Sequence, residues 1–284
     1  MASSAVEAIL FARAGLFNAE LSWRLKVLRP VTEVACPARA FFTLALRGIL
    51  LKEFASDRHP DGRRTIRSFV LRTGRITAAQ KEAIERLWPR YGFDLPAGEI
   101  KLDELFGRRA ARVLEIGFGN GESLVRQAAA HPSLDFLGIE VHRPGIGHCL
   151  LEAEAANIDN LRVACSDAVE ALKENIPDRS LARANLYFPD PWPKKRHHKR
   201  RLLQEEFLGL IATKLVEGGS FYIATDWENY AGHIGEVVAA SEQFRIREHR
   251  VHNGDRPLDR PTTKFERRGL ALGHKIFEWQ LIRN

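Results

Sequence analysis

The stretch FPDPWPKKRHHKRRLL, residues 188–203, holds the most unusual set of reactive side chains in the sequence. Its one carboxylate, Asp190, lies between two prolines, which fix two backbone φ angles and stiffen the turn. Trp192 follows, and six of the eight residues 194–201 are Lys or Arg. Such cations bind phosphates, whereas a carboxylate can accept hydrogen bonds from a base. The stretch therefore predicts a rigidly held acid beside a surface for a polyanion, with Trp192 either stacked on a base or packed beneath the loop.

Glycines accompany a second group of candidate residues, in the sequence LEIGFGNGE. Gly117, Gly119 and Gly121 would let the backbone turn sharply and approach a ligand closely. A dinucleotide fingerprint, G-x-G-x-x-G, requires glycine where this chain has Glu122, and a carboxylate there would repel a pyrophosphate. Glu115, before the first glycine, suits a cationic ligand instead, such as the amino group of a methionine moiety.

Two more acids follow apolar segments farther along the chain. Glu140 lies 23 residues after Gly117, where an acid can bind both hydroxyls of a ribose, and Asp167 could meet an adenine amino group. The carboxyl ends of parallel strands share one crevice, so Glu115, Glu140 and Asp167 would line it together. This set favours S-adenosylmethionine, which has a ribose and an adenine but no phosphate. The alternative, that Glu140 and Asp167 only cap helices, stays open.

Strand and helix patterns alternate regularly from Arg112 onwards and predict the elements that must position these acids. We expect strands at 112–116, 134–141, 161–165, 181–188, 219–224, 244–251 and 276–283, and helices at 77–91, 121–130, 145–157, 169–175, 202–215 and 229–240. Strands separated by helices form right-handed parallel units, whereas the last two strands, with no expected helix between them, should pair antiparallel. The predicted fold class is α/β, a Rossmann-like doubly wound sheet of about seven strands, mostly parallel with one antiparallel edge strand.

The charge balance fits a polyanionic partner. The 284 residues carry a net charge of +7 with an isoelectric point near 9.5. Residues 58–75 contain six arginines and one acid, which we interpret as a basic arm. We divide the chain into an extension of unknown role (1–55), the basic arm with an N-terminal helix (56–111) and an α/β domain that would bind S-adenosylmethionine (112–284).

Composition argues against several other kinds of protein. No apolar run reaches the roughly 18 residues that a membrane span needs. The three cysteines form no C-x-x-C pair and the ten histidines show no H-x-x-x-H spacing, so we expect reduced thiols, a cytoplasmic protein and no metal site. His197 and His198 are adjacent, and we interpret them as RNA-facing or solvated.

With these features in view, six stretches resemble the bacterial tRNA (guanine-N7)-methyltransferases of the TrmB type, which are class I S-adenosylmethionine enzymes. They are LEIGFGNGESL, FLGIEVHRPGIGHCL, NLRVACSDAVEAL, LYFPDPWPKKRHHKRRLL, GGSFYIATDWENYA and RPTTKFERRGLALGH. The resemblance covers roughly residues 58–284, and FPDPW and TKFE are its specific parts. One departure is Pro193, where the family has His; it stiffens the loop further and removes no group that the reaction needs.

The resemblance implies roles for individual residues. Cofactor binding falls to Glu115, Glu140, Asp167 and Asp190, beside Gly117 and Gly119 of the turn, and Asp190 is also the implied catalytic residue. The implied substrate-binding residues are Lys194, Asp226, Thr263, Lys264, Phe265 and Glu266. The implied RNA-binding residues are Arg196, His197, His198, Lys199, Arg200 and Arg201.

The activity implied is that of a tRNA (guanine(46)-N(7))-methyltransferase, which moves a methyl group from S-adenosylmethionine to a guanine of the variable loop. We expect Asp190 to orient the base, and Asp226 and Glu266 to accept hydrogen bonds from guanine N1–H and N2–H₂. The segment 253–269 would be a loop folded over the site. The expected partner is tRNA, with no membrane and no metal, and the protein would be a monomer or a weak homodimer.

The main alternative is a small-molecule S-adenosylmethionine-dependent methyltransferase, against which the basic arm and the cations of 194–201 argue. A nucleotide-dependent oxidoreductase and a catalytically silent RNA-binding module are further alternatives. Glu115 and Glu122 argue against the first of these, and Asp190 in its rigid turn argues against the second.

Overall fold

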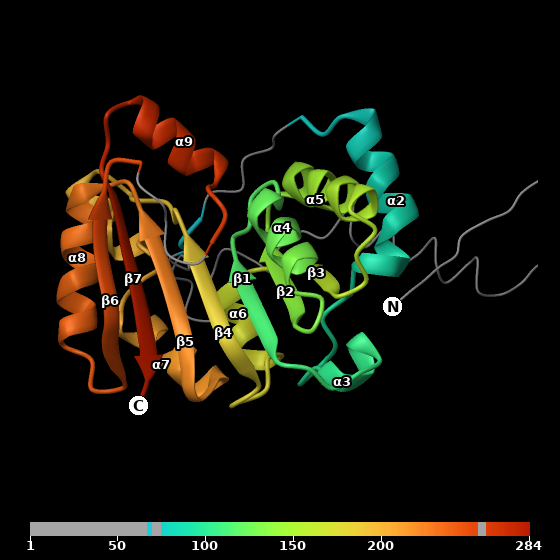
Figure 1. Cartoon of the computed structure of the whole chain (residues 1–284), viewed down its shortest axis with the longest axis horizontal. Coiled ribbons are helices and arrows are strands. Elements are labelled where there is room, and N and C mark those ends of the chain that lie inside the picture. Colours follow the sequence, from blue (N-terminus) through green and yellow to red (C-terminus); the bar gives the residue numbers. More distant parts are fainter. Residues whose placement is uncertain (1–66, 70–74, 255–259) are drawn as a thin grey trace, which may run out of the picture. The chain divides into compact units, whose positions relative to one another are not determined.

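One seven-stranded sheet organises the protein, as a computed structural model that describes residues 67–69, 75–254 and 260–284 shows (Figure 1). The strands lie in the order β3-β2-β1-β4-β5-β7-β6. They are β1 (Arg112–Ile116), β2 (Asp135–Glu140), β3 (Leu161–Cys165), β4 (Leu181–Tyr187), β5 (Leu215–Thr225), β6 (Phe244–His252) and β7 (Ile276–Arg283). Strands β1 to β5 are parallel, while β7 is antiparallel to both β5 and β6. The prediction of a mostly parallel Rossmann-like sheet is confirmed.

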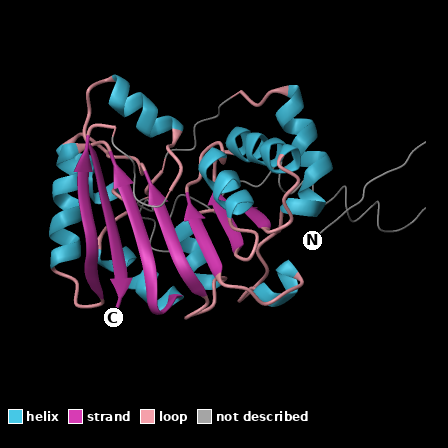
Figure 2. Ribbon diagram, viewed as in Figure 1, coloured by secondary structure: helices cyan, strands magenta, loops and turns pink. Residues whose placement is uncertain are grey.

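Helices cover both faces of this sheet (Figure 2). They are α2 (Ala78–Tyr91), α3 (Leu102–Phe106), α4 (Glu122–Ala130), α5 (Arg143–Ala155), α6 (Ala168–Glu174), α7 (Glu205–Lys214), α8 (Glu228–Ala239) and α9 (Lys264–Ala271), with a 3₁₀ helix, η1, at Lys195–Arg200. Helices α6, α7 and α8 share one apolar core with strands β1, β2, β4, β5 and β7. Helices α2, α4 and α5 share a second core with β1, β2 and β3 on the other face.

Helix α2 begins with a capping box. Thr77 Oγ1 accepts a hydrogen bond from Gln80 N (3.2 Å), and Gln80 Oε1 accepts one from Thr77 N (2.9 Å). Its buried face, which includes Ile84 and Tyr91, packs against α5. This part of the 56–111 region therefore belongs to the second core.

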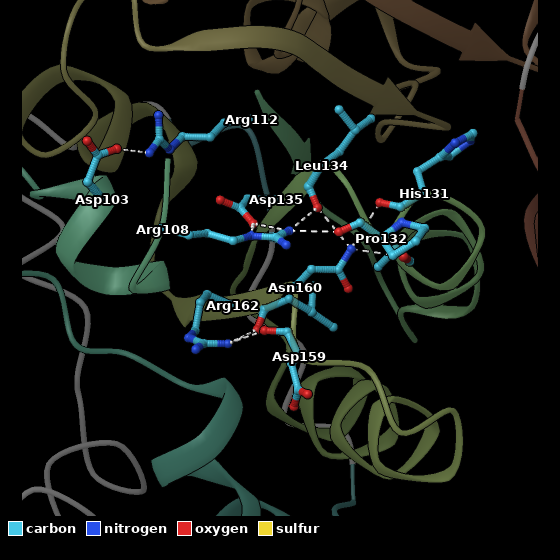
Figure 3. A network of polar contacts seen from close by, with 12 residues as sticks. Asp103, Arg108, Arg112, His131, Pro132, Leu134, Asp135, Asp159, Asn160 and Arg162 are labelled. Atoms are coloured by element: carbon cyan, nitrogen blue, oxygen red, sulfur yellow. Dashed lines mark hydrogen bonds and ion pairs between the residues drawn. The ribbon is translucent and has the colours of Figure 1, made fainter. Parts of the chain in front are cut away.

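A polar network joins the amino ends of β1, β2 and β3, as Figure 3 shows. Arg108 Nε donates to the fully buried Asp135 Oδ1 at 2.7 Å, and its Nη2 donates to the carbonyls of Pro132 (2.9 Å) and Leu134 (3.1 Å). The Asn160 amide donates to Leu134 O at 2.9 Å. Charged and amide donors therefore bind Asp135 Oδ1 and the carbonyl oxygens at this end of the sheet, while Asp135 Oδ2 has no hydrogen-bond partner among the described residues. The candidate site residues lie at the opposite end, where strands β1 to β5 finish.

Two expectations about the elements need correction. The last two strands do pair antiparallel, but α9 lies between them where the sequence predicted a loop, and the edge strand is β6. Helix α7 begins at Glu205, after the basic residues of η1. The cations therefore do not oppose the dipole of α7, whose first turn carries two glutamates.

The extension 1–55 and most of the basic arm lie outside the described residues. The described residues all belong to one compact unit. Among them, no helix combines the length and the apolar composition that a bilayer span requires. The same residues contain no group of three or more His, Cys, Asp and Glu side chains arranged to bind a metal ion.

Candidate active site

The glycine turn between β1 and α4 has the conformation that its three glycines allow. Gly117, Gly119 and Gly121 have φ angles of 68°, 60° and 79°, in the left-handed region that favours glycine. A Cβ atom at Gly121 would also lie 2.4 Å from Cys149 Sγ, on α5. Any side chain at this position would therefore strain the turn and separate α4 from α5.

Glu115, at the end of β1, is buried beneath the turn and only 3% exposed. Gln127 Nε2 of α4 donates to its Oε2 at 3.2 Å. Burial raises the pKa of Glu115 to about 8, against the opposing effects of Arg183, Arg260 and the Gln127 hydrogen bond. A carboxylate in this position gains most from a cation that reaches it.

Glu140, at the end of β2, holds the glycine turn in place. Its Oε2 accepts from Gly119 N at 2.7 Å, and its Oε1 accepts from Val141 N (2.7 Å) and His142 N (2.9 Å). Burial raises the pKa of Glu140, while these three hydrogen bonds lower it. Asp167, after β3, caps α6 by accepting from Val169 N at 2.8 Å. Asp167 therefore caps a helix, as the alternative interpretation expected, whereas Glu140 does not. Glu140 and Asp167 nevertheless follow the adjacent strands β2 and β3.

Asp190 lies in a constrained turn after β4, at the same edge. Phe188 and Trp192 have φ angles of 52° and 45°, which is unusual for bulky residues. Phe188 N donates to Ala224 O of β5 at 2.7 Å, so the turn begins beside the end of that strand. The Asp190 side chain is exposed. Burial raises the pKa of Tyr230 of α8 to about 12, and the negative charge of Asp190 contributes to that rise.

Arg201 holds the Asp190 turn against α8. Its Nε donates to Pro191 O at 3.0 Å, its Nη2 donates to Asn229 Oδ1 at 2.6 Å, and its guanidinium lies 4.9 Å from the centre of the Tyr230 ring. Arg201 is only 3% exposed. Although the resemblance implied RNA binding for Arg201, the structure places this cation inside the protein, where it supports the turn.

The other cations of the stretch form a surface. Lys194, Lys195, Arg196 and Lys199 are exposed, and His197, His198 and Arg200 are partly exposed. This surface is defined here as the basic patch.

Trp192, beside the basic patch, and Arg200, within it, contact the described part of the arm. Trp192 Nε1 donates to Ser68 O at 3.0 Å, and Arg200 Nε donates to Arg67 O at 3.0 Å. The Arg200 guanidinium also lies 4.3 Å from the centre of the Trp192 ring. Trp192 is thus packed between its own loop and the arm.

Helix α9 covers the glycine turn. In its first turn, Thr263 and Glu266 are buried, whereas Lys264 and Phe265 are exposed. Thr263 and Glu266 form a capping box, in which Glu266 N donates to Thr263 Oγ1 at 3.1 Å. The Glu266 carboxylate is 1% exposed and pairs with Arg260 at 2.5 Å. Lys264 and Phe265 are exposed, and a Cβ on Gly119 would lie 3.7 Å from Phe265 Cε2. Phe265 therefore approaches the glycine turn, whereas Thr263 and Glu266 shape the helix.

A charged pair joins α9 to α4. Arg267 Nη2 donates to Glu122 Oε2 at 2.8 Å, and this bond lowers the pKa of Glu122. Arg126 lies 2.8 Å from the other Glu122 oxygen. The Glu122 carboxylate therefore links α9 to the start of α4.

Asp226 follows β5 and faces α9 and β7. His274 Nδ1 lies 3.0 Å from Asp226 Oδ2, and the His274 ring meets the Trp227 ring edge-on at 6.2 Å. These residues line a cavity of about 430 Å³. The loops after β1, β4 and β5 thus bring the glycine turn, Asp190 and Asp226 to one edge of the sheet.

Comparison with known proteins identifies the family. A family model described as "Putative methyltransferase" matches residues 109–279. A tRNA (guanine-N(7)-)-methyltransferase of Alkalilimnicola ehrlichii is 54% identical over 223 residues, which cover 76% of this chain and 92% of that protein. One of Halorhodospira halophila is 53% identical over 216 residues, or 76% of this chain and 94% of its own.

This chain belongs to the tRNA (guanine-N7)-methyltransferase family. The resemblance of the six sequence stretches is thereby confirmed. A solved structure of a 16S rRNA (adenine(1408)-N(1))-methyltransferase variant from Catenulisporales acidiphilia has a TM-score of 0.47 and 17% identity, covering 66% of this chain and 96% of that one. A likeness of this size adds nothing to the family assignment.

Some residues that contact the candidate site residues were not predicted from the sequence. Arg183 of β4 donates to Asn185 Oδ1 (2.8 Å) and to the Tyr187 hydroxyl (3.1 Å). Its positive charge also lowers the pKa of Glu115, against the larger effect of burial. Polar residues at every second position of an otherwise buried strand were the available signal. Arg260 and His274 carried no such local signal, because their partners are brought to them by the fold.

Proposed function

We propose that the protein transfers a methyl group from S-adenosylmethionine to N7 of a guanine in tRNA, at position 46 of the variable loop. The family assignment supports the reaction class. The observation that carries the proposal is the place of Asp190, in a rigid turn between the acid-lined crevice and the basic patch. A small-molecule substrate would use the crevice and leave the patch without a role.

The crevice residues fit S-adenosylmethionine. The buried Glu115 carboxylate would receive its amino group, because a cation relieves the cost of burying that charge. Glu140 would accept ribose hydroxyls while it holds the Gly119 amide, and Asp167 would lie toward the adenine. Phe265 and the glycine turn would enclose the bound molecule between α9 and α4.

The chemistry asks little of the chain beyond position and charge. When bound, S-adenosylmethionine supplies an electrophilic methyl group, and guanine N7 has a lone pair and no proton to lose. No general base is therefore needed. The chain must hold the purine in line with the methyl group and stabilise the positive charge that develops on the ring, and Asp190 would do both.

Recognition of the base falls to Asp226 rather than Glu266. Glu266 is buried, paired with Arg260 and engaged in the cap of α9, so a guanine could reach it only if α9 opened. Asp226 is partly exposed beside the cavity, and its carboxylate can accept from guanine N1–H and N2–H₂. The basic patch would hold the phosphates of the tRNA around this base.

A transfer assay tests this function. The purified full chain is incubated with methyl-labelled S-adenosylmethionine and unmodified tRNA, and the tRNA is digested to nucleosides. We expect the label in 7-methylguanosine. Label found only in small molecules added as acceptors would support the alternative methyltransferase and overturn the proposal.

A further inference from the structure

The cavity beside Asp226 is built from elements that are distant in sequence. Strand β5 ends at Thr225, while β7, which is antiparallel to β5, begins at Ile276. Antiparallel pairing brings the start of β7 to the edge where β5 ends, so His274 comes to lie beside Asp226. Asp226, Trp227, His274 and Phe277 line the resulting cavity of about 430 Å³, which is large enough for a nucleobase.

The Asp226 carboxylate is fixed from two sides. His274 Nδ1 lies 3.0 Å from Oδ2. Gly269 of α9 packs against the same carboxylate so closely that a Cβ there would lie 2.6 Å from Oδ2. Both Asp226 and His274 remain partly exposed, with side chains 27% and 33% accessible. One oxygen is therefore engaged inside the protein while the residue still borders the cavity.

The Arg201 guanidinium links the cavity to the Asp190 turn. Arg201 donates both to Pro191 O, next to Asp190, and to Asn229 Oδ1, in the wall of the cavity. Phe188 N, at the start of the turn, bonds to Ala224 O, two residues before Asp226. A base in the cavity would consequently have its position set by the same framework that holds Asp190.

We propose that His274 is a positioning residue, which fixes Oδ2 of Asp226 so that Oδ1 accepts hydrogen bonds from N1–H and N2–H₂ of the target guanine. This inference rests on the proposed function. An imidazole that donates from Nδ1 holds Oδ2 and limits the rotation of the carboxylate. Adenine carries no N1–H, so a carboxylate fixed in this orientation selects guanine. The competing interpretation is that the pair only attaches the start of β7 to the end of β5.

Two isosteric substitutions separate these interpretations. His274→Asn places an amide N–H near the position of Nδ1, whereas His274→Gln places its amide near Nε2 and removes the donor that Asp226 uses. A hydrogen bond to a charged group changes a binding constant by roughly tenfold or more. We therefore expect His274→Gln to raise the KM for tRNA about tenfold with kcat within about twofold, and His274→Asn to stay within about threefold of the wild type on both parameters.

A modified substrate and a matched control sharpen the test. Inosine lacks the N2 amino group, so transcripts with guanine or inosine at the target position measure recognition by Asp226. We expect His274→Gln to lower the wild-type preference for guanine toward unity, with unchanged affinity for S-adenosylhomocysteine. His249→Ala, which removes an imidazole stacked at 4.8 Å on Trp279 of β7, should leave the preference intact.

The results of these assays distinguish the proposed role of His274 from the proposed methylation of guanine N7. Unchanged KM and preference in His274→Gln, in an enzyme that methylates guanine, would overturn the role of His274 alone. Equal losses in the Gln, Asn and His249→Ala variants would assign the pair a purely structural role and overturn it too. Failure of the wild type to methylate guanine N7 would instead overturn the proposed function.

Discussion

At the scale of the residue, Asp190 and Glu115 are two carboxylates given different properties by their surroundings. Asp190 is exposed in a stiff turn, where its carboxylate could face a purine that becomes cationic. Glu115 is buried and has a pKa of about 8, so near neutral pH it gains charge only when a cation approaches. One is suited to act on the base and the other to bind the methyl donor.

We predict that Asp190→Asn lowers kcat by about a hundredfold or more, because the amide removes the negative charge but keeps the shape of the side chain. The affinity for S-adenosylhomocysteine should fall by less than about tenfold. Single-turnover kinetics and calorimetry measure the two effects. Near-normal turnover in Asp190→Asn would remove this residue from the chemistry.

Glu115 predicts a pH dependence of cofactor binding. Burial raises the pKa of Glu115 in the folded protein to about 8, so the free protein keeps this proton between about pH 4.5 and 8. The unfolded chain has released the proton over this range, so the free energy of unfolding falls as the pH rises from about 4.5 to 8. Binding of a cationic amino group should release a proton near pH 7, and the affinity should rise as the pH rises from 6 to 8. Calorimetry with S-adenosylhomocysteine in buffers of different ionisation enthalpy measures this release.

Glu115→Gln is the matched control for that measurement, since it has the same size but no titrating proton. It should bind the ligand more weakly and release fewer protons at pH 7. If wild type and Glu115→Gln released the same number of protons, Glu115 could not be the group that receives the amino group.

At the scale of the element, α9 joins the two halves of the site. Its amino end is held by the buried pair of Glu266 with Arg260, and it reaches the glycine turn through Phe265 and through Arg267 to Glu122. Toward its carboxyl end, Gly269 contacts Asp226. A shift of α9 would therefore change both the methyl-donor crevice and the base cavity.

We predict that Arg267→Gln raises the Kd for S-adenosylhomocysteine about two- to fivefold, because a partly exposed ion pair contributes under about 1 kcal/mol. Glu122→Gln should have a similar effect, and the double variant should add little to either. Arg268→Gln, an exposed neighbour on the same helix, is the control. Additive losses in the double variant would show that the two residues act separately.

Local patterns predicted the elements well where one face of each is buried. Strands β1, β3 and β7 have the expected boundaries, and Thr77 with Gln80 marks the start of α2. Helix α9 was missed although Thr263 and Glu266 form the same kind of capping pattern, because the helix is short and the sequence before it is rich in proline and charge. The pairing of Glu266 with Arg260 could not be predicted from the sequence. Arg260 also pairs with Glu278, which comes close to it only after β7 has paired with β5.

At the scale of the whole molecule, the excess of cations serves different purposes at different places. Lys194, Lys195, Arg196 and Lys199 lie on the surface, while Arg201, within the same stretch, is buried. Sequence predicted the basic patch as a unit because charge runs carry no information about which side chain turns inward. The fold divides it, with Arg201 supporting the Asp190 turn.

We predict that neutralising the exposed cations weakens tRNA binding and reduces the slope of log K against log salt by about one for each lost phosphate contact. The Lys194→Gln and Lys199→Gln variants, alone and combined, measure this by titration at several salt concentrations. Arg201→Gln should instead lower Tm, since it leaves the Asn229 and Pro191 oxygens without their donor. An unchanged salt slope in the combined lysine variant would show that the patch does not bind phosphates.

Transfer of the methyl group to guanine N7 is tested most directly with two tRNA transcripts that differ only at the proposed target. One carries guanine, and the other carries 7-deazaguanine, which has carbon in place of N7. We predict close to one labelled methyl group per molecule of the guanine transcript, recovered as 7-methylguanosine, and none in the 7-deazaguanine transcript. Equal labelling of both transcripts, or label on another atom, would contradict it.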